Sequence, residues 1–189
     1  MTNIANLESL RALDVNEAPQ GSREILEKSW AQTGRIPNMY ALMANSPGLL
    51  KTYRAGYDVF RAESGFTKTE QEIVLLAISR FHECTYCVAV HSSIADMNRV
   101  PHDVTDAIRN GNAIADKKLE TLRSFTTIMV ASRGRPTPED LDRLISVGFT
   151  ELQVLEIILA IAVKTISNYS NHLFDTELDP GFSAREWHP

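Results

Sequence analysis

Two cysteines and a histidine lie close together in the stretch ECTYCVAVH, at residues 83–91. Cys84 and Cys87 are three residues apart, and His91 follows four residues after Cys87. On a helix, these spacings place all three side chains on one face. The sequence contains no further cysteine. The stretch could therefore be a redox pair, part of a metal site, or a helix that contains two small apolar residues.

These residue types can support thiol redox chemistry. The thiolate is the reactive form of cysteine, and a free thiol has a pKa of about 8.5. In the first turn of a helix, unpaired N–H groups and the helix dipole favour an anion, which by itself favours Cys84 as the more acidic thiol. His91 can accept the thiol proton or stabilise the thiolate. The second thiol can capture a sulfenic acid as a disulfide, so the pattern indicates peroxidase or disulfide-exchange chemistry.

A carboxylate earlier in the chain could serve as a proton partner. Glu72 lies twelve residues before Cys84, at the start of the apolar stretch EIVLLAIS. Glu70 forms a capping box with Thr67, but Glu72 has no such role. We expect Glu72 to bind His91 directly or through water, with its pKa raised by the apolar surroundings.

The elements that must position these residues are helical. Caps and apolar periodicity predict helices over about 22–33, 46–63, 69–80, 84–98, 101–111, 117–132, 137–148 and 150–173. No stretch has strand-like alternation with turn signals at both ends. We predict an all-α fold with a single domain over residues 1–189. Its expected parts are an N-terminal helical extension (1–62), an active-site helical unit (63–100) and a second helical unit that acts as scaffold (101–189).

Two stretches of the chain resemble each other. GFTKTEQEIVLLAISRFHECTYCVAVH begins at Gly65, and GFTELQVLEIILAIAVKTISNYSNHLF begins at Gly148. Laid without gaps, they share Gly-Phe-Thr, Leu-Ala-Ile and a tyrosine, which indicates an internal duplication of a helical unit. In this register serines replace Cys84 and Cys87, so packing alone does not explain the cysteines.

Composition limits the expected partners and location. The net charge is −5 and the pI about 5.5, without a basic patch, which argues against nucleic acid as a partner. The N-terminal residues have no signal-peptide pattern. The apolar run VLEIILAIAVKTI holds Glu156 and Lys164, and we expect a buried helix too short to span a bilayer. The expected compartment is the cytosol, where two lone cysteines are more often catalytic, redox-active or metal-binding than structural.

The spacing of Glu72, Cys84, Cys87 and His91 resembles the signature of the alkyl hydroperoxidase D and carboxymuconolactone decarboxylase superfamily. The tight resemblance covers residues 60–98, and the helical layout is similar over most of the chain. The resemblance implies an all-helical bundle that is a trimer or hexamer of identical chains. Family members of the best-known type have a second histidine where this chain has Tyr86, which makes Tyr86 a possible auxiliary site residue.

The resemblance implies a thiol-dependent peroxidase that reduces hydroperoxides and is itself reduced by an external dithiol. Cys87 would attack the peroxide, Cys84 would resolve the intermediate, and Glu72 and His91 would relay protons. No cofactor or metal is expected. The alternatives are a decarboxylase-like proton-transfer enzyme that uses Glu72 and His91, or a non-enzymatic redox-sensing oligomer.

Three further expectations concern histidines near the motif. A zinc site made of Cys84, Cys87, His91 and either His82 or Glu83 remains an alternative, although structural zinc usually draws its ligands from two segments. His82 is expected to be exposed to solvent. His172, in the stretch NYSNHL, is expected to cap or support the last helix.

Overall fold

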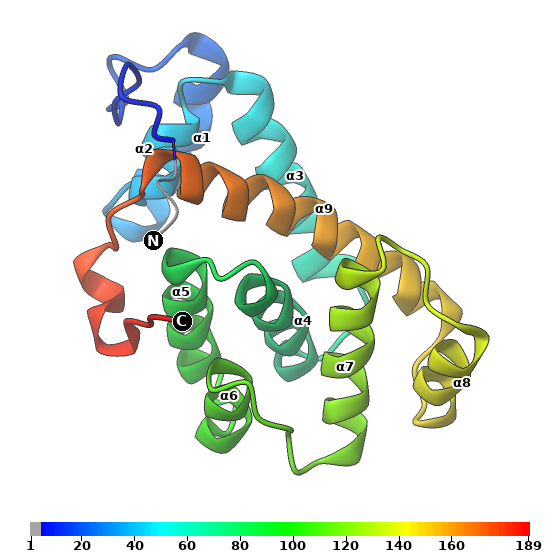
Figure 1. The fold of residues 1–189 in the computed structure, drawn as a ribbon. Helices are drawn as coiled ribbons and strands as arrows, with labels where there is room; N and C mark the ends of the chain where they lie inside the picture. The colour runs from blue at the N-terminus through cyan, green and yellow to red at the C-terminus, as the bar shows by residue number, and fades with distance from the viewer. Residues whose placement is uncertain (1–4) are drawn as a thin grey trace.

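The computed structural model describes residues 5–189, which form nine α-helices and one short 3-10 helix, with no strand in that range (Figure 1). The elements are α1 (Gln20–Thr33), α2 (Asn38–Met43), α3 (Pro47–Glu63), α4 (Lys68–Phe81), α5 (Thr85–Met97), α6 (His102–Arg109), α7 (Lys117–Ala131), α8 (Pro138–Ser146), α9 (Glu151–Phe174) and η1 (Pro180–Arg185). The prediction of an all-α fold is confirmed. The short helix α2 was not expected from the sequence.

Helix α4 lies at the centre of the molecule, where it packs against α5, α6, α7 and α9 (Figure 1). All its residues from Glu70 to Ser79 are buried, as expected for a helix that is apolar on nearly every face. The predicted capping box of Thr67 and Glu70 is confirmed at its start. Beyond its end the chain reverses through Glu83, whose φ of 55° is left-handed, so α5 folds back onto α4.

Helices α4 and α9 begin alike but continue differently. Gly65 and Gly148 both have positive φ, 69° and 97°, and a capping box follows each of them. Helix α9 then runs unbroken through the positions that align with the break between α4 and α5. The two units therefore share their start and not their central turn, and the duplication stays a prediction.

By length and composition alone, α9 could cross a membrane, and it is the one such helix in the described part of the chain. The expectation that this segment is too short is wrong, because α9 has 24 residues. Its inner face carries the buried polar residues Lys164, Asn168 and Asn171, and the two asparagines bond groups on neighbouring elements. We therefore interpret α9 as a core helix, packed along α3 and across α4 (Figure 1).

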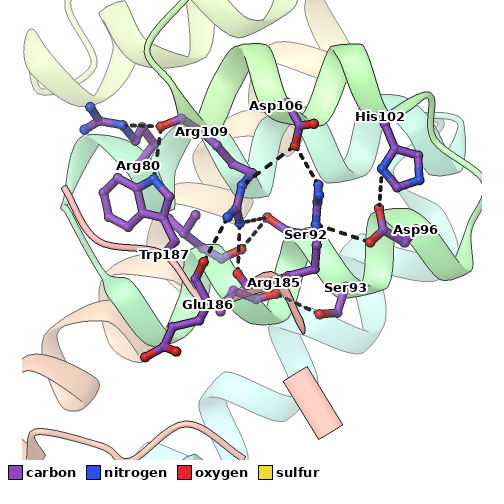
Figure 2. Close-up of polar contacts among 12 residues, drawn as sticks. Arg80, Ser92, Ser93, Asp96, His102, Asp106, Arg109, Arg185, Glu186 and Trp187 are labelled. Carbon is purple, nitrogen blue, oxygen red and sulfur yellow. Dashed lines mark hydrogen bonds and ion pairs between the residues drawn. The ribbon is translucent and has the colours of Figure 1, made fainter. Parts of the chain in front are cut away.

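A polar network holds the C-terminal segment against α5 and α6 (Figure 2). Arg185 pairs with Asp96 of α5 at 3.2 Å and with Asp106 of α6 at 2.9 Å. Arg109 donates to the carbonyl oxygen of Arg185, and the Trp187 indole N–H donates to the carbonyl of Arg109 at 3.1 Å. The segment that follows α9 is thereby fixed beside the helix that carries both cysteines.

A glycine permits the close approach of α3 and α9. A Cβ atom built at Gly56 would lie 2.7 Å from Cγ2 of Val163, closer than packed side chains allow. Val163 is adjacent to Lys164, so this crossing sets how deeply the inner face of α9 approaches the core.

We predict that Gly56→Ala destabilises the protein by about 1–3 kcal/mol through overpacking. Urea unfolding followed by circular dichroism measures the change. Gly48→Ala is the matched control on the same helix, since no atom lies within 4 Å of its Cβ position. If both variants unfold at the same urea concentration, the close crossing is not a packing constraint.

Candidate active site

Both cysteines lie at the start of α5, as the sequence predicts. Cys84 is the N-cap residue and Cys87 lies in the first turn. Both are free thiols, and they are 1% and 2% exposed. Each thiol shifts the pKa of the other, so the two sulfurs lie near each other in the reduced protein.

The two thiols have opposite tendencies to ionise. Burial opposes ionisation of Cys87, but hydrogen bonds from Cys84 and Asn171 and the positive charge of Lys164 lower its pKa to about 5. The amide Nδ2 of Asn171 lies 3.2 Å from the Cys87 sulfur. The hydrogen bond to Cys87, together with burial, raises the pKa of Cys84. The expectation from helix-end electrostatics, that Cys84 is the more acidic thiol, is therefore wrong.

Glu72 forms the predicted contact with His91. Its Oε2 atom lies 3.1 Å from Nδ1 of His91, and its Oε1 atom lies 2.6 Å from Nη1 of Arg61. The carboxylate is fully buried. Burial acts to raise the pKa of Glu72, but the hydrogen bonds and charges of His91 and Arg61 outweigh it and lower the pKa. The expectation of a raised pKa is wrong, because the sequence does not reveal that Arg61 reaches this apolar site.

His91 is neutral at physiological pH. Burial and the nearby charge of Lys164 lower its pKa to about 4, although Glu72 acts in the opposite direction. A neutral ring that donates from Nδ1 to Glu72 leaves Nε2 as an acceptor. The positive charge beside the Cys87 thiolate is therefore supplied by Lys164, not by His91.

Tyr86 points its hydroxyl at the C-terminal segment. Its OH donates to Oδ2 of Asp179 at 2.6 Å, and the backbone N–H of Asn38 donates to the other carboxylate oxygen at 3.1 Å. Burial and the neighbouring carboxylate raise the pKa of Tyr86. Tyr86, which stands in the place of the family histidine, thus links the start of α5 to Asp179 in the chain after α9. Asp179 in turn binds the start of α2.

A pocket of about 330 Å³ opens beside Cys84. Its lining comes from the start of α5, the end of α9 and the chain terminus: His82, Glu83, Cys84, Thr85, Tyr86, Asn171, His172, Asp175, Thr176 and Pro189. Cys87 is not part of this lining. Of the two cysteines, Cys84 is the one that borders this pocket.

The neighbouring histidines do not form a metal site with the cysteines. His82 is half-buried, and its Nδ1 lies 3.0 Å from the Asn168 amide, so the expectation of a solvent-exposed side chain is wrong. His172 lines the pocket beside Cys84. Within residues 5–189, no three His, Cys, Asp or Glu side chains lie together as metal ligands.

Three residues of this site were not expected from the sequence: Arg61, Lys164 and Asn171. Lys164 had a detectable signal, because it is the single lysine within a strongly apolar run. It is 1% exposed, and its charge acts on both cysteines and on His91. Arg61 and Asn171 lie near the ends of their helices among other polar residues, where the sequence does not distinguish them from surface side chains.

Comparison with known proteins supports the predicted resemblance. Residues 47–119 match the model of the Carboxymuconolactone decarboxylase family, which confirms the resemblance inferred from the sequence. This segment contains Glu72, both cysteines and His91. A search of curated proteins found no match.

Solved structures share the fold over nearly the whole chain. One is an alkylhydroperoxidase AhpD core structure, an uncharacterized peroxidase-related protein from Ralstonia eutropha JMP134, with a TM-score of 0.82, 20% identity and 96% of each chain covered. A peroxidase-related protein from Silicibacter sp. TM1040 has a TM-score of 0.77 and 18% identity, with 98% of this chain and 99% of that chain covered. The debrominase Bmp8, in a complex with 2,3,4-tribromopyrrole, has a TM-score of 0.77 and 18% identity, with 97% of each chain covered. The fold is therefore that of the AhpD-like proteins.

We predict that Cys87 titrates as a thiolate with a midpoint near pH 5 in the reduced protein. Because its pKa is lowered, the thiolate is present above that pH and disappears as the pH falls through it. The ultraviolet absorbance of the thiolate measures the titration. Cys87→Ser removes the signal and leaves Cys84 protonated.

Lys164→Met is the informative variant for this titration. Without the lysine charge, burial of Cys87 is opposed only by hydrogen bonds, so the midpoint moves upward. A thiolate midpoint that is the same in wild type and Lys164→Met contradicts the assignment of Lys164 as the stabilising cation.

We predict that Tyr86→Phe destabilises the protein by about 1–3 kcal/mol, because it leaves the buried Asp179 carboxylate short of a donor. The Cys87 titration should be unchanged. Thermal unfolding and thiolate absorbance measure the two effects. A large shift in the titration without loss of stability would instead place Tyr86 in the redox site.

Proposed function

We propose that the protein is a thiol-dependent peroxidase that reduces hydroperoxides through Cys84 and Cys87. The observation that carries this proposal is a buried pair of free thiols at the start of α5, with the Asn171 amide nitrogen 3.2 Å from the Cys87 sulfur. The surroundings lower the pKa of Cys87 and raise that of Cys84. Such a pair contains both an attacking thiolate and a resolving thiol. The family match and the peroxidase-related structural neighbours support the same reaction class.

In the proposed reaction, the Cys87 thiolate attacks one peroxide oxygen and the bond between the two oxygens breaks. Cys87 becomes a sulfenic acid, and the substrate leaves as an alcohol once it gains a proton. The Cys84 thiol then attacks the Cys87 sulfur and expels water, which closes the disulfide. The raised pKa of Cys84 keeps its proton available for the departing hydroxide.

The pocket beside Cys84 supports an exchange step with an external dithiol. Cys84 lines this pocket and Cys87 does not, so we propose that the reductant forms its mixed disulfide with Cys84. This releases Cys87, whose low pKa makes it the better leaving thiolate. A reducing cytosol, the proposed location, would supply such a dithiol.

We propose that Glu72 and His91 form the accepting side of the proton relay. Glu72 holds the His91 ring so that Nε2 is free to accept a hydrogen bond from a thiol, a water molecule or the substrate. This arrangement does not favour the decarboxylase alternative, because Arg61, His91 and Asn98 already occupy both carboxylate oxygens of Glu72.

We also propose a homo-oligomer. One face of α9 exposes Leu152, Leu155 and Ile158 by 66%, 59% and 48%, at spacings that bring them to one side of the helix. An apolar stripe of this kind supports association. A non-enzymatic redox-sensing oligomer would share this surface, and only its slow turnover would distinguish it from the enzyme.

We predict that the two cysteine variants lose peroxide turnover for different reasons, as measured by peroxide consumption with excess dithiol. Cys87→Ser loses turnover, because no low-pKa thiolate remains. With peroxide but without dithiol, Cys84→Ser reacts once and stops as a sulfenic acid, which dimedone traps and mass spectrometry locates on Cys87. Asn171→Ala should reduce turnover less, since it removes one of the contacts that stabilise the thiolate.

Full turnover in both cysteine variants would rule out the thiol mechanism. Dimedone labelling of Cys84 in the Cys87→Ser variant, with normal turnover, would reverse the two roles. A disulfide that forms no faster than that of a free dithiol would favour the redox-sensing alternative.

A further inference from the structure

A second pocket, of about 240 Å³, is lined by side chains from α1, α2, α3, η1 and the loop between α1 and α2. Neither cysteine lines it, and neither do Glu72 and His91. Its walls come from parts of the chain as distant in sequence as residues 25 and 182. The proposed peroxidase chemistry does not use this pocket, so it is a separate candidate for a binding site.

The charged side chains in this pocket are mostly basic. Three cations line it, namely Lys28, Arg35 and Arg54, whereas Asp58 is the single carboxylate in the lining. Asp58 pairs with Arg54 at 2.7 Å. In the part of the chain that the structure describes, neither Lys28 nor Arg35 forms an ion pair with a carboxylate. Two cations thus lack a counter-ion in a protein whose net charge is −5, and an anion in the pocket would supply one.

Aromatic rings support both guanidinium groups of the pocket. The Arg35 guanidinium lies over the ring of Phe182, 5.1 Å from its centroid, and that of Arg54 lies over the ring of Tyr40 at 5.4 Å. Arg54 also donates to the Tyr40 hydroxyl. Stacking on a ring fixes the plane of a guanidinium and leaves N–H groups at its edge available as donors. An anion therefore meets donors that are already oriented, which lowers the entropic cost of binding.

A glycine makes room for Arg35 beside Phe182. A Cβ atom built at Gly181 would overlap Nη1 of Arg35. Gly181 does not have a positive φ, so its backbone conformation does not require glycine. The close approach of the guanidinium does require it, because any side chain at Gly181 would displace Arg35. The short helix η1 thus supplies both the ring under this guanidinium and the space next to it.

The size and the remaining lining of the pocket limit the kind of ligand. Its volume is below the roughly 300–1,000 Å³ of pockets that hold drug-sized molecules. Ile25 and Pro37 add apolar surface beside the aromatic rings. A bare inorganic ion would leave this surface uncovered. The lining therefore suits a small molecule with one negatively charged end and a short or flat apolar body.

We propose that this pocket binds a small organic anion that carries a carboxylate or phosphate group on a short or flat apolar body. Lys28 and Arg35 bind the charged group, since a guanidinium can meet a carboxylate or a phosphate through two parallel hydrogen bonds. The apolar body lies against Ile25 and Pro37. This site goes beyond the proposed peroxidase function and does not depend on it.

Isothermal titration calorimetry on the reduced wild-type protein, at neutral pH and low ionic strength, tests the proposal with three probes. Benzoate and phenyl phosphate should each bind one to one, and the tighter of the two identifies the preferred charged group. Benzamide, which has the shape of benzoate without its charge, should bind much more weakly. Equal affinity for benzamide and benzoate overturns the proposal. So does the absence of saturable binding by either anion up to about 10 mM, well above a Kd of about 1 mM.

Inorganic phosphate tests the apolar part of the site. It should bind more weakly than phenyl phosphate, because it has no body to cover Ile25 and Pro37. Equal affinities for the two phosphates would overturn the assignment of an organic ligand.

Matched variants test where the anion binds. Lys28→Gln and Arg35→Gln should each weaken binding by about tenfold or more, the scale of one lost charge-assisted hydrogen bond. Both side chains are exposed, and thermal unfolding verifies that the variants fold. Lys117→Gln is the control for net charge, because Lys117 is exposed on α7 and does not line the pocket. The control should bind the probes like the wild type.

Gly181→Ala separates the position of Arg35 from its charge. This variant keeps every charge, but its Cβ displaces the guanidinium, so it should also weaken binding. Binding that depends on net charge alone would be unchanged in Gly181→Ala and equally reduced in Lys28→Gln and Lys117→Gln. Either result overturns the proposal.

Discussion

The buried carboxylate of Glu72 is the interaction around which this site is built. It pairs at 2.6 Å with Arg61, which reaches the core from α3, and contacts His91 of α5 at 3.1 Å. A second cation, Lys164, enters the same core from α9, which packs against α3. Its charge helps to lower the pKa of Cys87. The ionisation of Cys87 therefore depends on charges that α3 and α9 bring into the core.

Three local features of the fold bring Glu72, His91 and the two cysteines together. The left-handed turn at Glu83 folds α5 onto α4 and brings His91 to Glu72. Gly56 lets α3 and α9 cross closely enough for the inner face of α9 to reach the cysteines. The C-terminal segment, held by the network of Figure 2 and by the Tyr86–Asp179 bond, borders the pocket beside Cys84. Cys84 therefore borders the pocket, and Cys87 lies outside its lining.

The sequence predicted the features that depend on local spacing. The all-α fold, the capping box at Thr67 and the contact of Glu72 with His91 follow from caps, periodicity and the positions of residues on adjacent helices. The ionisation states did not follow, because they depend on Arg61 and Lys164, which approach from helices distant in sequence. Lys164 is an isolated charge in an apolar run, and that pattern could have indicated from the sequence that a buried cation lies near the cysteines.

The most direct test of the redox centre is the reaction of the reduced wild-type protein with an equimolar hydroperoxide, followed by stopped flow and by peptide mapping. We expect one Cys84–Cys87 disulfide per peroxide consumed, formed much faster than the disulfide of a free dithiol at the same pH. Thiols that remain free, or that oxidise no faster than the free dithiol, would contradict a peroxide-reducing site built on the Lys164–Cys87 interaction.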